Sequence, residues 1–503
     1  MTTTLEPTRP ERPAGSGDGR SPIALEPRRR SLRRWMADNP AWPIAAYLAG
    51  WPLWWVLGLT EFIPIFAAVP MLYRMYKWRA SGSRRLRFPP GFLIWGLFLL
   101  ISILGVVELG QTAPGTIVSS SGSELISWGS RTLTYIGCTI IMVYAGNLTE
   151  SELPRKRLAW LLGLVGLYTV IFGVLDTVDT HTVFTSPFAY IIPKHIQSTD
   201  QTIYLMLHPS FAQVQNLLGY AHGRPSAPFT YTNMFGNSLA ILVPWLFVVW
   251  WTYGNRKQRR LFMGASVLAF VSIVSTLDRG LWVGLGVMVL YLAFRFAARG
   301  KMLMIGAIFG TLVVVALVVL VTPVYGLLIQ RLHHGTSNAG RTGKSLIAYT
   351  DGAASPLIGW GDSRHQQGSL QSIAVGKTAD CQKCGQTSIG GNGQLQLMLI
   401  CSGVAGAGLY CLFFAYGIWR YRRDITPYGM VGVMVLFVGF WFIFVYEAVG
   451  PPLSFAMLAY AMLWKNDREN RLAAAADEPA VPADNGRPAI AGTTIPPRGV
   501  LSS

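Results

Sequence analysis

Long apolar blocks, repeated along most of the chain, are the feature that most constrains its fold. Each block holds roughly 18 to 22 residues, the length that a helix needs to cross the hydrocarbon core of a bilayer. A chain with 51% apolar and 13% charged residues is also too apolar for an ordinary soluble domain. The sequence therefore predicts an all-α, polytopic membrane protein with about 12 transmembrane helices. They are expected at residues 41–59, 61–76, 88–107, 126–147, 157–175, 234–252, 261–276, 281–297, 302–322, 394–418, 427–446 and 452–464.

The distribution of charge predicts how these helices are oriented. The chain has 42 Lys and Arg against 24 Asp and Glu, a net charge of +18. The basic residues lie in alternate loops, whereas an intervening loop such as 108–125 is nearly free of them. Because cytoplasmic loops carry such an excess of Lys and Arg, we expect an even number of spans and both termini in the cytoplasm. The excess charge then reflects membrane topology, and we expect no nucleic-acid partner.

The two ends of the chain differ from the apolar region between them. Residues 1–38 are basic and rich in Pro, Gly and Ser, and residues 466–503 are rich in Ala, Pro and Gly. Such compositions are typical of disordered segments. We therefore expect a disordered cytoplasmic leader at 1–38, a membrane domain at 39–465 and a disordered tail at 466–503. No cleavable signal peptide is expected, and the multi-pass domain should reside in the plasma (inner) membrane.

Two long polar segments, 176–233 and 323–393, are predicted to lie outside the cytoplasm. In the first, the apolar patterns at Ile203–Leu207 and Phe211–Leu218 predict short helices at the membrane interface or within a folded cap. The second contains Cys381 and Cys384, which an oxidising compartment would favour as a disulfide. A metal site and free thiols are the alternatives. A zinc site needs four ligands and no second Cys pair exists, so we expect no metal and no cofactor.

Four arginines are predicted near the outer ends of the helices: Arg131, Arg224, Arg279 and Arg341. Ionisable residues close to membrane spans are costly and are therefore functional candidates. Several guanidinium groups on one membrane face suit a diphosphate, because each can donate two charge-assisted hydrogen bonds to its oxygens. The alternative is that each arginine reaches the lipid headgroups or pairs with a neighbour such as Asp278. The acidic residues at this level are either general bases or structural partners: Glu61, Asp176, Asp179 and Glu447.

Four motifs, in this order, resemble those of the O-antigen ligase and polymerase superfamily. The stretch Arg224–Gly236 (RPSAPFTYTNMFG) resembles the family's "R…gtf.npN..g" at the start of a span. The turn Asp278–Trp282 (DRGLW) looks like the family's SRG-x-W turn, with Asp in place of Ser. Gly340-Arg341-Thr342 followed by Ser355–Gly361 (SPLIGWG) is similar to "gR…PliGwG". Gly391–Leu395 (GNGQL), ending at Gly403–Gly406 (GVAG), looks like "HN-x-x-L…G-l-x-G". The resemblance covers about residues 125 to 465.

The resemblance implies transfer of a glycan from an undecaprenyl-diphosphate carrier to a hydroxyl acceptor on the outer leaflet. That reaction would use no metal and would invert the anomeric carbon. Residues matching Arg224 and Arg279 would hold the diphosphate, and Arg341 would help bind the donor or the growing chain. The family's histidine, which would activate or orient the acceptor, is replaced by Gly391 or Asn392. Asparagine can orient a hydroxyl but cannot act as a base.

The sequence thus predicts a membrane glycosyltransferase, polymerase or ligase, in cell-surface polysaccharide biosynthesis, with other polysaccharide-assembly proteins as further partners. The catalytic candidates are Arg279, Asp278 and Asn392, and His365, His334 or Asp278 could replace the missing histidine. Two other classes stay open. A transporter or flippase of lipid-linked glycan would show charges near the bilayer midplane and an internal repeat, and neither is seen. A catalytically silent relative that scaffolds envelope assembly would explain the missing histidine.

Overall fold

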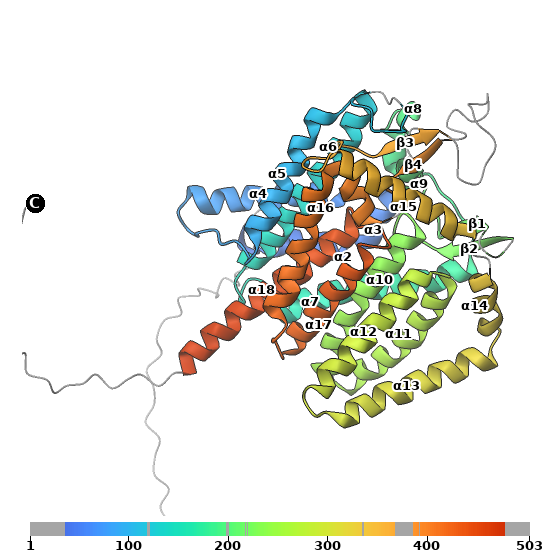
Figure 1. The fold of residues 1–503 in the computed structure, drawn as a ribbon. Helices are drawn as coiled ribbons and strands as arrows, with labels where there is room; N and C mark the ends of the chain where they lie inside the picture. The colour runs from blue at the N-terminus through green and yellow to red at the C-terminus, as the bar shows by residue number, and fades with distance from the viewer. Residues whose placement is uncertain are drawn as a thin grey trace, which may run out of the picture. The chain divides into compact units, whose positions relative to one another are not determined.

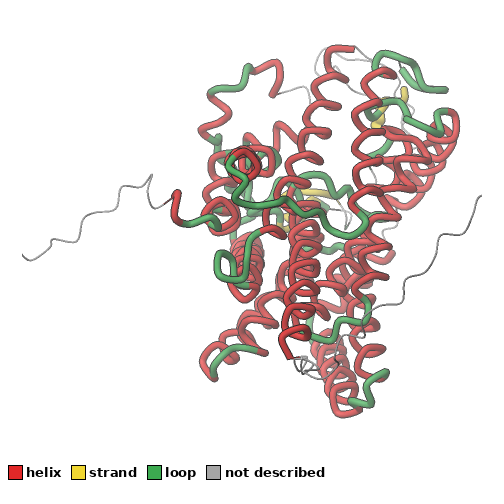
Figure 2. Tube along the Cα trace, turned by 90° about the vertical axis from the view of Figure 1, so that its left-hand side faces the viewer, coloured by secondary structure: helices red, strands yellow, loops and turns green. Residues whose placement is uncertain are grey.

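The computed structural model describes residues 36–117, 121–197, 201–216, 218, 220–333, 336–367, 386–391 and 393–477. The chain divides into two units, Met1–Pro40 and Ala41–Ser503. In the first unit the described residues include one helical turn, at Met36–Asp38. In the second unit helices predominate, as Figures 1 and 2 show, and the described strands form two short antiparallel pairs. The prediction of the all-α fold class is therefore confirmed.

The second unit contains helices at both its apolar blocks and its polar segments. Their order is α2 (Trp42–Ala49), α3 (Trp51–Leu57), α4 (Ile63–Ala80), α5 (Phe92–Leu104), α6 (Ser121–Asn147), α7 (Arg155–Val178), α8 (Lys194–Gln197), α9 (Gln201–Leu207), α10 (Thr232–Leu246), α11 (Arg256–Ser275), α12 (Arg279–Ala297), α13 (Met302–Val321), α14 (Val324–His333), α15 (Thr336–Ala354), α16 (Gln394–Tyr421), α17 (Pro427–Phe442) and α18 (Pro451–Asp477). A π-helical turn, Phe247–Thr252, extends α10. The strand pairs are β1 (Ala212–Asn216) with β2 (Ala221–Pro225), and β3 (Arg364–Gln367) with β4 (Gln386–Ile389).

Helices occupy each of the apolar segments predicted from the sequence, but not all of them are single long helices. Five helices in the described part of the chain are both long and apolar enough to cross a membrane: α7, α10 with its π-helical turn, α12, α13 and α16. These helices suggest a multi-pass membrane protein. The prediction of one helix over 41–59 is wrong. Pro52 has no N–H with which to continue the hydrogen bonding of α2, so α2 ends at Ala49 and α3 begins at Trp51.

The basic loops meet at one end of the bundle, which we call the basic end. Arg84 forms an ion pair of 2.7 Å with Glu152. Arg155 donates a hydrogen bond of 2.7 Å to Asn466, whose amide in turn donates to Asp424 at 2.7 Å. These contacts join loops that the charge distribution predicts on a single membrane face. The opposite end, which carries the two polar segments, we call the insert end.

Helix α18 continues past its apolar part into the region where the sequence predicts a disordered tail. Lys465 and Asn466 are fully buried. The ammonium group of Lys465 donates hydrogen bonds to the carbonyl oxygens of Thr149 and Leu153. Tertiary contacts at the basic end therefore order the chain beyond Trp464, and the helix ends at Asp477. Residues 478–503 lie outside the described residues, as do residues 1–35 of the predicted leader.

At the insert end, helix α16 is broken and a loop fills the break. Gly403 has φ 66° and ψ −176°, values that no α-helix contains. The N–H groups of Trp360 and Gly361 donate to the carbonyl oxygens of Ile400 (2.7 Å) and Cys401 (3.2 Å), and the N–H of Ala405 donates to Pro356 (2.9 Å). Backbone groups freed by a break need such partners in apolar surroundings. The SPLIGWG motif therefore packs against the GVAG motif.

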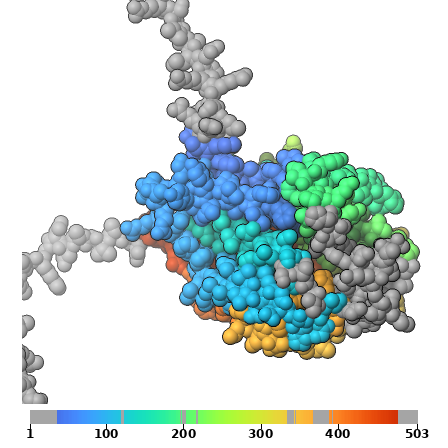
Figure 3. Space-filling view, turned by 90° about the horizontal axis from the view of Figure 1, so that it is seen from above, coloured from blue at the N-terminus to red at the C-terminus, as the bar shows by residue number. Residues whose placement is uncertain are grey.

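At the insert end, the loop between α5 and α6 also lies beside the second polar segment. Figure 3 shows the chain around α5 and the start of α6, in light blue, beside the orange residues of the second polar segment and α16. The N–H of Ile117 donates to the carbonyl oxygen of His365 at 2.8 Å. The loop before α6 thereby lines the same end of the bundle as β3.

Candidate functional site

The tight turn between α11 and α12 is the centre of the candidate site. Asp278 caps α12: its Oδ1 accepts the N–H of Gly280 at 3.0 Å, and the residue is only 6% exposed. Leu277, which precedes it, is buried with φ 49°. A branched side chain rarely adopts this left-handed conformation, so surrounding contacts must hold the turn in place.

The structure brings Arg224 to this turn. Arg224 lies on β2 and is 5% exposed. Its Nη1 donates to Gln215 on the paired strand at 2.6 Å, and its Nε donates to the carbonyl oxygen of Thr276. Its Nη2 lies 4.0 Å from Asp278 Oδ2. The guanidinium is therefore held between the hairpin and the turn.

Two further arginines belong to the same cluster. Arg279 is the first residue of α12 and is half-buried. Arg331, on α14 in the second polar segment, is 6% exposed, and its Nε donates to the carbonyl oxygen of Leu277 at 3.1 Å. Arg331 is not among the site residues predicted from the sequence, because its position in the chain gives no sign of the turn that it contacts. We call Arg224, Asp278, Arg279 and Arg331 the arginine cluster.

The loop between α17 and α18 closes the cluster from the side. A Cβ atom added to Gly280 would lie 2.7 Å from the hydroxyl oxygen of Tyr446, so the glycine of the DRGLW motif permits a close approach. The carbonyl oxygen of Tyr446 accepts the N–H of Gln394, the first residue of α16, at 2.7 Å. The side chain of Gln394 donates to the hydroxyl of Tyr135 on α6 at 3.2 Å. The α17–α18 loop thus connects the turn to the start of α16 and, through Gln394, to α6.

Arg131, one turn before Tyr135 on α6, has a different set of partners. Its Nη1 lies 2.7 Å from Asp362 Oδ1, and its Nη2 donates to the carbonyl oxygen of Gly361. The same loop is held by Arg364, which is fully buried, forms an ion pair of 3.2 Å with Glu124 and donates to the carbonyl oxygen of Trp360 at 2.9 Å. These contacts favour a structural role for both arginines in holding the SPLIGWG loop.

The structure describes the backbone of Arg341, but not all of the remaining predicted site residues. Arg341 lies in α15, four residues before Ser345, whose hydroxyl accepts from the side chain of Gln396 in the first turn of α16 at 3.4 Å. The backbone of α15 therefore runs beside the start of α16. The three remaining candidates, Asn392, Cys381 and Cys384, lie outside the described residues.

Three of the acidic candidates carry structural hydrogen bonds. Asp176 is 1% exposed, and its Oδ2 accepts the N–H groups of Ser226 (3.0 Å) and Ala227 (3.2 Å), which fixes the chain between β2 and α10. Glu61 accepts from the hydroxyl of Thr230 at 2.7 Å. Asp179 accepts backbone N–H groups in the turn after α7. The alternative of structural partners is favoured for these carboxylates.

His222, which is not among the residues predicted from the sequence, lies on the hairpin near Arg224 in the chain. In the register of the pair, His222 faces Gln215 and Arg224 faces Gln213. Because alternate residues of a strand share one face, His222 and Arg224 lie on the same side of β2. His222 is half-buried, and desolvation together with the charge of Arg224 lowers its pKa. Its imidazole is therefore neutral at neutral pH, the form that accepts a proton.

The hairpin itself corrects a prediction. The pattern at Phe211–Leu218 predicts a short helix, but residues 212–216 form β1. The sequence Ala-Gln-Val-Gln-Asn alternates apolar and polar residues, which is the period of a strand. The companion prediction at Ile203–Leu207 is confirmed, because α9 covers these residues.

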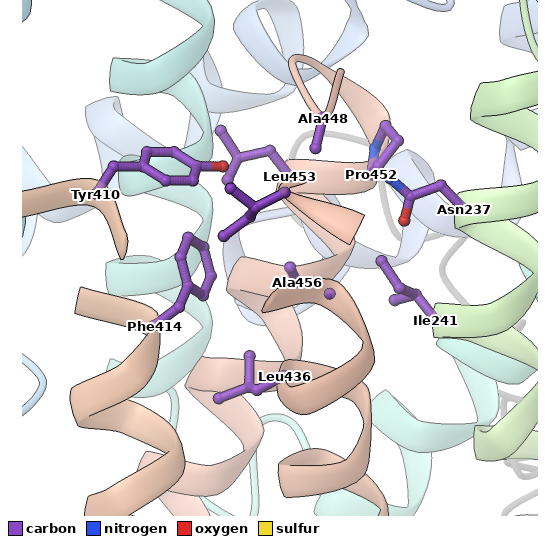
Figure 4. Close-up of a pocket in the computed structure, with 11 residues that line it drawn as sticks. Asn237, Ile241, Tyr410, Phe414, Leu436, Ala448, Pro452, Leu453 and Ala456 are labelled. Atoms are coloured by element: carbon purple, nitrogen blue, oxygen red, sulfur yellow. The ribbon is translucent and has the colours of Figure 1, made fainter. Parts of the chain in front are cut away.

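A small cavity lies in the core next to the site, between α10, α16, α17 and α18 (Figure 4). Its volume is about 20 Å³, which is enough for a water molecule and too small for a sugar. Figure 4 shows Asn237 on one side of this cavity and Tyr410 with Phe414 on the other. Both amide atoms of Asn237 are buried with no hydrogen-bond partner in the described part of the chain. The adjacent Gly236 faces Asp278, since an added Cβ would lie 3.3 Å from Asp278 Oδ2.

Within the described ranges, no group of three or more His, Cys, Asp or Glu side chains is arranged to hold a metal ion. No model of a known protein family matches this sequence, and no curated protein matches it. The geometry of the arginine cluster is therefore the main basis for assigning a function.

Proposed function

We propose that this chain is a membrane glycosyltransferase that transfers a glycan from a polyprenyl-diphosphate carrier, such as undecaprenyl diphosphate, to a hydroxyl acceptor. The observation that carries the proposal is the arginine cluster at the insert end. Arg224 on β2 and Arg331 on α14 contact the capped turn from which Arg279 begins α12. Guanidinium groups held in place before the reaction stabilise the charge that develops on a departing diphosphate.

The proposed reaction uses the residues around this turn as follows. The acceptor hydroxyl oxygen attacks the anomeric carbon of the donor, and the bond from that carbon to the diphosphate oxygen breaks. The electron pair of that bond goes to the diphosphate, which Arg224, Arg279 and Arg331 stabilise. The hydroxyl proton passes to His222, which is neutral and shares the face of β2 with Arg224. Asp278 does not take the proton in this scheme, because it caps α12 and positions Arg224.

The proposed topology follows the predicted one, with twelve spanning helices in the plasma membrane and both termini in the cytoplasm. The distribution of basic residues supports it: the basic loops meet at one end of the bundle, and cytoplasmic loops carry such residues. The arginine cluster is at the other end, so the transfer would take place on the extracytoplasmic face. A lipid-linked donor would reach the cluster from the outer leaflet.

Glycan analysis in a deletion strain of the source organism tests the proposal. Strains carrying Arg279→Ala or Arg224→Ala protein, expressed at the wild-type level, should lose the polymer or its attachment. The control variant is Arg256→Gln, an exposed arginine at the basic end, which should behave as wild type. Collapse to single repeat units would mean a polymerase, and full-length chains left on the carrier would mean a ligase. Wild-type glycan in the Arg224→Ala/Arg279→Ala strain would refute the diphosphate site.

The role of His222 is tested separately. Replacing His222 by Asn should reduce the transfer rate by about a hundredfold or more, because Asn cannot accept the proton. The wild-type rate should fall at acid pH as the imidazole is protonated, and the variant should lack this dependence. The matched control is His181→Asn, an exposed histidine in the same polar segment. If the His222→Asn protein transfers glycan at the normal rate and the Arg279→Ala protein is inactive, then His222 is not the base, and the proposal of a diphosphate site is unaffected.

A further inference from the structure

Three buried hydrogen-bond donors at the end of α12 and in the turn that follows it, at the basic end, lack acceptors among the described residues. Tyr291 and Arg295 lie four residues apart on α12 and share one helix face, and Arg299 lies in the turn after Ala297, where α12 ends. The Tyr291 hydroxyl, Arg295 Nε and Arg299 Nη2 are all buried, and none has a hydrogen-bond partner among the described residues. Buried donors without acceptors are rare in folded proteins and destabilise them. Three such donors at one helix end indicate that an acceptor from outside the chain belongs there.

The remaining contacts of these side chains are with neutral groups, among them the ring of Tyr291, whose centroid lies 5.9 Å from Arg295 Cζ. Arg295 donates its two Nη groups to the carbonyl oxygens of Arg422 and Asp424, which are neutral groups. Arg299 donates Nη1 to the thioether sulfur of Met430 at 3.0 Å, and a thioether is a weak acceptor. The like charges of Arg295 and Arg299, at the end of α12 and just after it, also repel each other. An anion that accepts from both arginines would remove this cost.

The neighbouring carboxylate of Asp424 makes no ion pair with Arg295 or Arg299, and the groups that donate to it are neutral. Oδ1 of Asp424 accepts from the N–H and the hydroxyl of Thr426, and Oδ2 accepts from the amide of Asn466 at 2.7 Å. The turn that carries it also contains Arg420, Arg422 and Arg423, and Lys301 is exposed just after α12. The region therefore has a strong excess of positive charge.

The surface next to these donors is apolar. Leu290 and Phe294, one turn apart on α12, are 71% and 72% exposed, and Leu303 at the start of α13 is 83% exposed. Helix α13 packs against α12, has a mean hydropathy of 2.9 and contains no buried residue. A ligand that fits both features has a phosphate group joined to long apolar chains. Free phosphate matches only the first feature.

We propose that the end of α12 and the turn to α13 bind an anionic phospholipid of the leaflet at the basic end. Tyr291, Arg295, Arg299 and Lys301 would donate to its phosphate headgroup, and its acyl chains would lie along the exposed faces of α12 and α13. The site is separate from the arginine cluster and does not depend on the proposed glycan transfer. It would hold the α12–α13 pair, whose few contacts with the other helices are mainly those of α12 with α17 and α10.

Lipid binding to the purified full-length protein in a neutral detergent tests this site. Native mass spectrometry and thermal unfolding would compare added phosphatidylglycerol, phosphatidylcholine and soluble glycerol phosphate. The wild type should retain phosphatidylglycerol and be stabilised by it, and should respond little to the other two. The Arg299→Gln/Lys301→Gln variant should bind phosphatidylglycerol about tenfold more weakly, because it loses charge-assisted hydrogen bonds.

The matched control is Arg256→Gln/Lys257→Gln, which removes two exposed basic residues at the same end but on α11. This control should bind phosphatidylglycerol as the wild type does. If both variants lose the same lipid affinity, the effect comes from general surface charge, and the specific site is refuted. If Arg299→Gln/Lys301→Gln does not fold, Arg299→Lys, which keeps the charge but not the planar geometry, should fold and bind more weakly than wild type. Equal binding of both lipids, or equal stabilisation by glycerol phosphate, would overturn the proposal.

Discussion

Replacing Gly359 by alanine tests whether the SPLIGWG motif is a structural insertion into the break of α16. Gly359 has φ 69°, and a Cβ atom at this position would lie 2.4 Å from the backbone nitrogen of Gly403 and 2.5 Å from that of Ser402. Both neighbours are backbone atoms of the broken helix, so they cannot turn away as a flexible side chain could. The loop and the helix would have to separate.

Two effects add up to the expected loss. An alanine with φ in the left-handed region costs about 1–2 kcal/mol, and forcing a methyl group into a closely packed site costs about 1–3 kcal/mol more. Gly359→Ala should therefore lower the free energy of unfolding by about 2–5 kcal/mol. Gly82→Ala is the matched control, because Gly82 has φ 64° but nothing within 4 Å of an added Cβ. Gly82→Ala should lose only the free energy of unfolding that comes from the backbone conformation, about 1–2 kcal/mol.

Denaturant unfolding of the three purified proteins in one detergent measures both differences. The excess loss of Gly359→Ala over Gly82→Ala reports the steric contact between the loop and the helix break. If the two variants lose the same free energy, the loop does not pack into α16 as described. The glycines of the motif would then need another explanation.

Two further predictions concern buried charges at the insert end. Burial raises the pKa of Asp351 to about 6, above the value of about 4 in an unfolded chain, so its contribution to stability falls as pH rises from about 4 through 6. Asp351→Asn should therefore be more stable than wild type at pH 8, by at most about 3 kcal/mol, and equal to it at pH 4. The same gain in the free energy of unfolding at both pH values would contradict this prediction. Arg364→Met removes the ion-pair partner of buried Glu124 and should destabilise the protein by about 3–5 kcal/mol. The double variant Arg364→Met/Glu124→Leu should regain part of this stability. Thermal unfolding of both variants measures the two effects.

The positions of the helices could be predicted because apolar length is a local property of the sequence. The resemblance implied that Arg224 and Arg279 hold one diphosphate, and the structure places Arg224 beside the turn from which Arg279 follows. Arg331 and Arg364 could not be found in this way, because their partners, Leu277 and Glu124, lie far away in the chain. Likewise, short segments such as residues 212–216 carry too few periods to separate a strand from a helix, and only the pairing with β2 decides.

The pairing of charges separates the two groups of arginines at the insert end. Around the SPLIGWG loop each arginine has its own carboxylate: Arg131 pairs with Asp362, and Arg364 with Glu124. Such balanced buried pairs hold a structure together and leave no charge for a ligand. At the turn between α11 and α12, Asp278 caps a helix with Oδ1 and lies 4.0 Å from Arg224 Nη2 with Oδ2. Arg224 and Arg331 also donate there to the carbonyl oxygens of Thr276 and Leu277. Positive charge gathered at a partly buried turn attracts anions, and we therefore propose the arginine cluster as the place where the diphosphate binds.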